Sequence, residues 1–354
     1  MGVGERPLSV LRSREGRIRG AWRLGLFVVL TVVLVAALGL LAMLLPDDAA
    51  SSALRLGLGA AASLLAVLGA SWWMMERVEG TSLAALGLPV DGLLPRELGA
   101  GFLLGGGLIA LVVLALALPG WVAWRLEPGG FAPGPFLVSF LQLSTFLLVA
   151  AFLEELLFRG YPLQVLAEAW GGAAAVGATA VVFGLFHAWN PGLGASILHE
   201  PSLAKILPLI NIALAGLILG LAYWRTYSLW YATGVHLGWN WVMGFATDLP
   251  VSGLEPSTPG YALFDTPGFD AVVRGPSLWT GGSFGPEGGL LVTLASLAGI
   301  AWLVRTDRLH RALRVRALGP LPDRRDGGPG ASRTGGSPGA AGAGERVSTG
   351  GEAP

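Results

Sequence analysis

Residues 136–160 read FLVSFLQLSTFLLVAAFLEELLFRG, an apolar run that ends in two acidic residues and an arginine. Charged side chains are costly in a bilayer, at about 2.5–3.5 kcal/mol for each charge at the centre of a membrane helix. A chain that keeps Glu154, Glu155 and Arg159 in such a run is expected to use them. This stretch therefore predicts a membrane helix with a functional end.

The composition predicts a membrane protein throughout. The chain has 354 residues, of which 53% are hydrophobic and 13% are charged, whereas soluble domains carry about 25% charged residues. The formal net charge is zero, so the overall charge balance gives no indication of a nucleic-acid partner. The chain has no cysteine, which excludes disulfides, thiolate metal ligands, a thiol nucleophile and lipidation on cysteine.

Eight apolar runs are long enough, or nearly so, to cross a bilayer, for which about 20 residues are needed. They lie at residues 24–45, 56–75, 98–118, 136–158, 171–188, 207–224, 228–245 and 288–304. Spanning segments must form helices or a closed barrel, because the bilayer offers no water to bond backbone groups. The runs do not alternate with a period of two, so we predict an all-α polytopic membrane protein of about eight helices.

Arginine distribution predicts the orientation. Six arginines precede or begin the first run, and seven lie within residues 305–325. Basic residues favour the cytoplasmic side, and an even number of spans puts both ends on one side. We therefore predict a multi-pass protein of the cell membrane with both termini cytoplasmic.

The predicted organisation has four parts: a basic N-terminus at 1–23, a transmembrane domain at 24–304 with its motif-bearing core at 136–245, a basic juxtamembrane segment at 305–318 and a tail at 319–354. The tail is rich in Gly, Ala, Ser, Pro and Arg. Such a composition buries too little apolar surface to offset the entropy of ordering, which predicts disorder.

Spacing divides the roles of the two acids. Glu155 and Arg159 are four residues apart with the acid first, the favourable order for an ion pair within a helix. Glu154 points about 100° away and has no such partner in its own helix. A desolvated carboxylate without a partner suits a general base. We therefore predict that Glu154 takes part in the chemistry and that Glu155 and Arg159 have a structural role.

Two later runs add imidazole and amide groups. His187 lies four residues after Phe183 on the same face, and His236 and Asn240 share a face of the seventh run. A histidine and an asparagine aimed at one point can stabilise an oxyanion. Alternatively, Glu154, His187 and His236 would make a three-ligand site for Zn²⁺ or another divalent metal, with an open position for water.

Glu-Glu-x-x-x-Arg, Phe-x-x-x-His and His-x-x-x-Asn, in this order on successive apolar runs, resemble the CAAX-protease and bacteriocin-processing family of intramembrane endopeptidases, also called the Abi family. The resemblance covers about residues 136–245. It implies an eight-helix membrane fold and a CAAX-type glutamate protease or metalloprotease. By this similarity Glu154 activates a water, His187 orients it, and His236 with Asn240 stabilises the oxyanion.

The substrate implied is a membrane protein or peptide in or at the lipid bilayer, lipidated or CAAX-like substrates included. Substrate identity, metal use, oligomeric state and the choice between protein processing and bacteriocin immunity stay open from the sequence. Two other functions compete with proteolysis: a non-proteolytic scaffold or immunity factor, and a proton-coupled transporter. Neither needs an unpaired carboxylate beside paired oxyanion donors, so the motifs favour the protease.

Pairs of glycines spaced by four recur within the apolar runs. They are Gly101 and Gly105, Gly216 and Gly220, and Gly234 and Gly238. Small residues at this spacing let membrane helices approach closely. We predict plain helix packing for all three, with the third pair bringing a neighbouring helix against the helix that carries His236.

Overall fold

A computed structural model describes residues 18–42, 49–190, 193, 202–254 and 265–309. These residues all lie in the first of two units, Met1–Asp323 and Arg324–Pro354. The predicted tail at 319–354, residues 1–17 of the predicted N-terminus and residues 310–318 of the predicted juxtamembrane segment lie outside the described residues.

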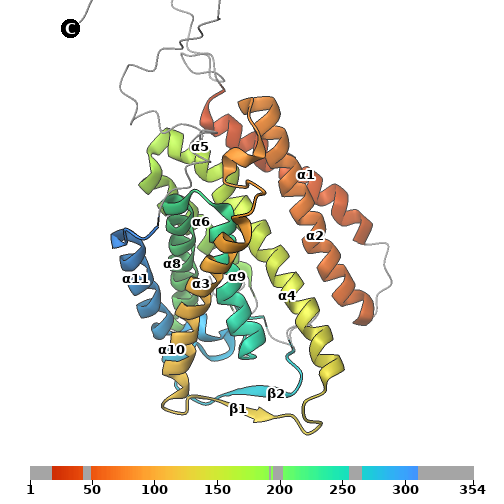
Figure 1. Cartoon of the computed structure of the whole chain (residues 1–354), viewed down its shortest axis with the longest axis vertical. Helices are drawn as coiled ribbons and strands as arrows, with labels where there is room; N and C mark the ends of the chain where they lie inside the picture. The colour runs from red at the N-terminus through yellow and green to blue at the C-terminus, as the bar shows by residue number, and fades with distance from the viewer. Residues whose placement is uncertain (1–17, 43–48, 191–192, 194–201, 255–264, 310–354) are drawn as a thin grey trace, which may run out of the picture. The chain divides into compact units, whose positions relative to one another are not determined.

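Helices make up most of the described structure (Figure 1). The longer helices are α1 Gly20–Ala42, α2 Ala49–Trp73, α3 Leu94–Ala117, α4 Pro133–Glu155, α5 Tyr161–Trp170, α6 Gly172–Phe186, α8 Leu203–Thr226, α9 Leu229–Trp241 and α11 Leu290–Arg305. Short helical turns are η1 Met74–Glu79, η2 Leu83–Leu86, η3 Leu156–Gly160, η4 His187–Trp189, η5 Val242–Ala246, α10 Ser277–Thr280, η7 Gly282–Phe284 and η8 Pro286–Gly288. The predicted all-α class is confirmed.

Each predicted span falls on a helix. Six helical stretches are long and apolar enough to cross a membrane: Gly20–Leu40, Leu54–Glu79, Leu94–Ala117, Pro133–Trp170, Gly172–Trp189 and Lys205–Thr226. The last predicted span is the shorter apolar helix α11. The seventh is α9 with η5, which is less apolar because it carries the histidine, asparagine and glycines of the site and lies mostly buried among other helices.

Helix α9 packs against α3, α4 and α8. Its approach to α3 is close because glycines face each other: an added Cβ on Gly105 would lie 1.9 Å from the Val235 carbonyl oxygen. An added Cβ on Gly234 would lie 2.2 Å from the Leu98 carbonyl oxygen. The glycines predicted to pack beside His236 therefore do so, and they leave α9 no space to move towards α3.

The chain continues without a break from α4 through η3 into α5. Turn η3 is a π-helical turn, a rare conformation that is frequent at functional sites. It begins immediately after the two adjacent acids of α4. It also separates the spanning helix from α5, which has Tyr161 and Leu163 fully buried.

An ion-pair cluster joins α1 to α5. Arg23, predicted as part of the basic N-terminus, is buried and donates to Glu79 at 2.9 Å and to Glu168 at 2.8 Å. The Tyr161 hydroxyl donates to the same Glu79 oxygen at 2.7 Å. At least one of the predicted cytoplasmic arginines is thus a structural link between helices.

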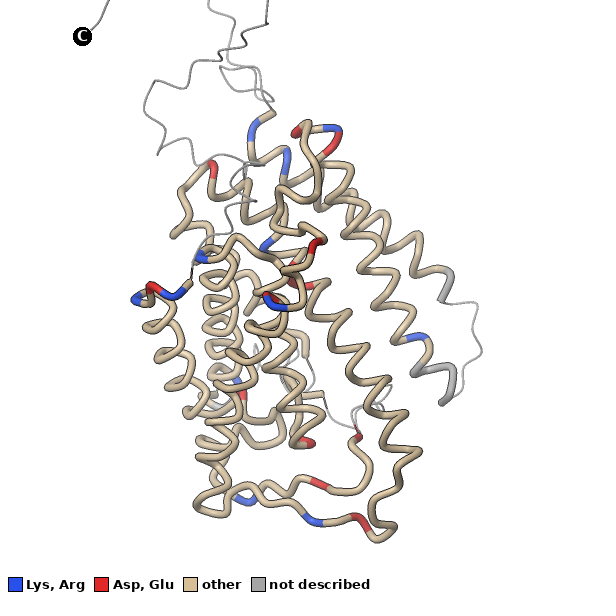
Figure 2. Tube along the Cα trace, in the orientation of Figure 1, with Lys and Arg blue, Asp and Glu red and all other residues tan. Residues whose placement is uncertain are grey.

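Two short strands, β1 Val122–Leu126 and β2 Phe269–Val273, pair in an antiparallel manner at one end of the bundle (Figure 1). They join the loop after α3 to the loop before α10. Figure 2 shows the charged positions gathered mainly towards the two ends of the helices, with long uncharged stretches between. This distribution fits helices that cross a bilayer.

Candidate active site

The end of α4 holds a fully buried ion pair. Arg159 Nη1 donates to Glu155 Oε1 at 3.0 Å, and neither side chain is exposed. Arg159 Nη2 donates to the Gly216 carbonyl of α8 at 2.9 Å, and the guanidinium carbon lies 4.4 Å from the centroid of the Phe183 ring. The predicted pair is present, and it ties α4 to α6 and α8.

Glu155 has a second partner that spacing did not predict. Its Oε1 atom lies 2.9 Å from His236 Nδ1 on α9. A carboxylate that accepts from one ring nitrogen fixes the orientation and tautomer of a histidine. Glu155 therefore links the structural pair to the histidine of the predicted oxyanion site.

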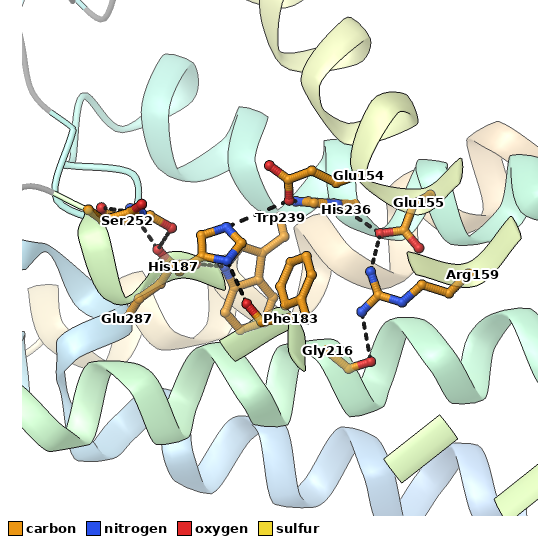
Figure 3. Close-up of polar contacts among 11 residues, drawn as sticks. Glu154, Glu155, Arg159, Phe183, His187, Gly216, His236, Trp239, Ser252 and Glu287 are labelled. Carbon is orange, nitrogen blue, oxygen red and sulfur yellow. Dashed lines mark hydrogen bonds and ion pairs between the residues drawn. The ribbon is translucent and has the colours of Figure 1, made fainter. Parts of the chain in front are cut away.

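Glu154 faces both histidines (Figure 3). Its Oε2 atom lies 3.7 Å from His187 Nε2 and 3.8 Å from His236 Nε2. That oxygen is buried and has no hydrogen-bond partner among the described residues. Separations of this length exceed a direct hydrogen bond, so the three atoms keep their bonding capacity for a water or a substrate at the cavity wall.

His187 is held from its other side. Its Nδ1 atom lies 2.8 Å from the Phe183 carbonyl oxygen, and the Phe183 ring packs against the imidazole. Since a carbonyl only accepts, Nδ1 carries the proton and Nε2 is directed towards Glu154. The Phe-x-x-x-His motif thus places both the backbone partner and the packing partner of this histidine.

The four predicted catalytic residues, Glu154, His187, His236 and Asn240, line one cavity of about 200 Å³. Its remaining wall is mostly apolar, with Phe146, Ile212 and Val235 among the lining side chains. The structure thus brings together residues that span 87 positions of the chain, from 154 to 240. A small, largely apolar cavity with a few converging polar groups is typical of an active site.

The cavity also contains residues that spacing did not single out. Glu287, Ser252, Asn190 and Trp239 line it, and Glu287 Oε1 accepts from Trp239 Nε1 at 3.1 Å. The one available sequence signal for Glu287 was the Gly-Pro-Glu-Gly-Gly segment before the last apolar run. Spacing gave no signal, because the partners of Glu287 are distant in the sequence.

Within the described residues, no group of three or more histidine and acidic side chains is arranged to hold a metal ion. The metal site predicted at Glu154, His187 and His236 stays a prediction.

Residues 136–242 match the protein-family model described as type II CAAX prenyl endopeptidase Rce1-like. The chain therefore contains an Rce1-like domain, which confirms the resemblance to the CAAX-protease family. Comparison with curated proteins and with solved structures found no match. The match supports a protease of the CAAX type, and the apolar helices indicate a multi-pass membrane protein.

Proposed function

We propose that this protein is an intramembrane endopeptidase that hydrolyses a peptide bond of a membrane-associated substrate with a water activated by Glu154. The observation that carries the proposal is the position of Glu154 Oε2, 3.7 Å and 3.8 Å from the two histidine Nε2 atoms at the wall of the cavity. Glu155, its neighbour, is already held by Arg159 and His236.

In the proposed reaction the Glu154 carboxylate takes a proton from water while the water oxygen bonds to the substrate carbonyl carbon. His187 orients the water. The carbon–nitrogen bond then breaks, and the leaving amine takes the proton from Glu154. Proton transfer by a positioned carboxylate contributes about 10²–10⁴-fold to rate.

His236 and Asn240 would stabilise the negative oxygen of the intermediate. Because His236 Nδ1 lies against the Glu155 carboxylate, Nε2 can donate only when the ring carries both protons. Glu155 would stabilise the positive ring in this state. A preorganised donor of this kind is worth about 10²–10³-fold in turnover.

A cleavage assay with purified protein and membrane peptides tests the proposal. Glu154→Gln keeps the shape of the side chain but removes its basicity, so cleavage should be lost while the protein stays folded. Glu76→Gln is the matched control, because Glu76 is exposed and lies outside the cavity. Loss of cleavage in both variants, or in neither, would contradict the proposed role of Glu154.

We further propose that both termini are cytoplasmic, supported by the six arginines at the start of the chain and the seven within residues 305–325. Reporter fusions at residue 354 and beside Asp265 should report opposite sides of the membrane. Reports from one side only would contradict the even number of spans.

A further inference from the structure

Glu287 is a buried acid that the reaction above does not use. It lies in turn η8, outside the residues that match the family model, and is 5% exposed. It lines the same cavity as Glu154. Figure 3 shows the two acids on opposite sides of His187.

Hydrogen bonds hold the Glu287 side chain in place. One carboxylate oxygen accepts from Trp239, and the other accepts from Ser252 twice, from the backbone N–H at 2.7 Å and from the hydroxyl at 2.8 Å. Asn211 of α8 donates to the Glu287 carbonyl at 2.7 Å and so fixes the backbone as well. Both oxygens act only as acceptors, as the charged form of a carboxylate does.

Ser252 extends this network towards His187. Asn190, three residues after His187, donates to the Ser252 carbonyl at 3.1 Å. Trp239 belongs to the same helix as His236. The Glu287 carboxylate is thus a fixed part of the cavity wall, connected to both elements that carry the histidines.

Among the described residues of the cavity, Glu287 has no permanent cation beside it, and the two histidines face Glu154. Among the described residues that line the cavity, none is a lysine or an arginine. Arg159, on the far side of Phe183, is already bound to Glu155 and Gly216. The sequence of the three undescribed stretches within residues 191–264 contains no lysine or arginine either.

We infer that Glu287 determines substrate specificity: the substrate side chain that lies beside Glu287 is uncharged or cationic, and an acidic side chain there is rejected. This inference rests on the proposed proteolytic function. Like charges brought together in a buried site are strongly unfavourable, and neutral or basic groups avoid this repulsion. The expected substrate carries no acidic side chain at the position that lies beside Glu287.

The test uses peptides that differ at one position, with Lys, Gln or Glu placed in turn at each of the four residues on either side of the cleaved bond. Wild-type protein should cleave the Glu peptide at least about tenfold more slowly than the Gln peptide at one or more positions. Glu287→Gln should remove this preference at the same position. Glu287→Asp, which keeps the charge, and Glu76→Gln, an exposed control, should retain it.

The ratio of the two rates does not depend on how much of a variant folds, so a destabilised Glu287→Gln still reports on the inference. Equal cleavage of Glu and Gln peptides by wild-type protein at every position would overturn it, as would a ratio unchanged by Glu287→Gln. If cleavage depends on Glu154 but shows no charge preference, the inference about Glu287 is wrong and the proposed function stands. Absence of any Glu154-dependent cleavage defeats the proposed function.

Discussion

The segment at residues 136–242 and the elements outside it contribute differently to the cavity. The segment supplies every group in the proposed reaction, from Glu154 to Asn240. The outer elements supply support: α3 lies against α9 through facing glycines, and Glu287 of η8 binds Trp239 and Ser252. The groups of the proposed reaction thus lie in one matched segment, whereas their spacing depends on helices and turns outside it.

Arg159→Met should give the largest loss of stability, because it leaves Glu155 buried without its counter-charge. Removing one partner of a buried pair costs about 3–5 kcal/mol. Arg305→Met is a matched control, since Arg305 is exposed at the end of α11. The measurement is the melting temperature in detergent. We also expect Glu155→Gln to destabilise the protein. If Arg159→Met and Glu155→Gln both had normal stability, the structural role of this ion pair would be contradicted.

His236→Ala and Asn240→Ala should each lower turnover by about 10²–10³-fold, the cost of one oxyanion donor. These variants sharpen the comparison because they change only the matched segment. The melting temperature of Asn240→Ala should stay close to that of wild type, and kcat should fall more than KM rises. A loss confined to KM would instead place Asn240 in substrate binding.

Gly105→Ala tests the supporting region. Its Cβ would meet the Val235 backbone of α9, and overpacking typically costs about 1–3 kcal/mol. Gly107→Ala on the same helix is the control, because no atom lies within 4 Å of its added Cβ. We expect lower stability and lower turnover for the first variant only. Equal behaviour of the two would show that the α3–α9 contact does not position His236.

Asp248 lies in the loop after η5, and Asp248→Asn should have the smallest effect on stability. Burial raises its pKa from 3.8 to about 6, against the opposing effect of backbone hydrogen bonds from Ala271 and Thr266. The folded state therefore holds a proton that the unfolded state releases between these values, so this residue favours folding at low pH and loses that effect as pH rises through about 6. Melting curves from pH 4 to 7 should show wild type losing stability relative to Asp248→Asn. The opposite slope would contradict the burial of this carboxylate.

The sequence predicted most of the bundle and singled out the four residues that meet at the cavity, because local patterns mark both. Apolar runs located the helices, and spacing by four placed Glu155 beside Arg159 and His187 beside Phe183. The contact between Glu155 and His236 joins residues that are 81 positions apart in the chain. The contact between Glu287 and Trp239 joins residues that are 48 positions apart. No periodic pattern encodes such contacts, and the short strand pair β1–β2 was missed for the same reason.

The most direct test of the account is cleavage of a membrane peptide by metal-free wild-type and Glu154→Gln protein, with bound zinc measured on the same samples. Every trace of cleavage should depend on Glu154, whether or not zinc proves to be required. Measurable cleavage by metal-free Glu154→Gln protein would contradict this dependence, and absence of cleavage by wild-type protein in every sample would leave the scaffold interpretation ahead.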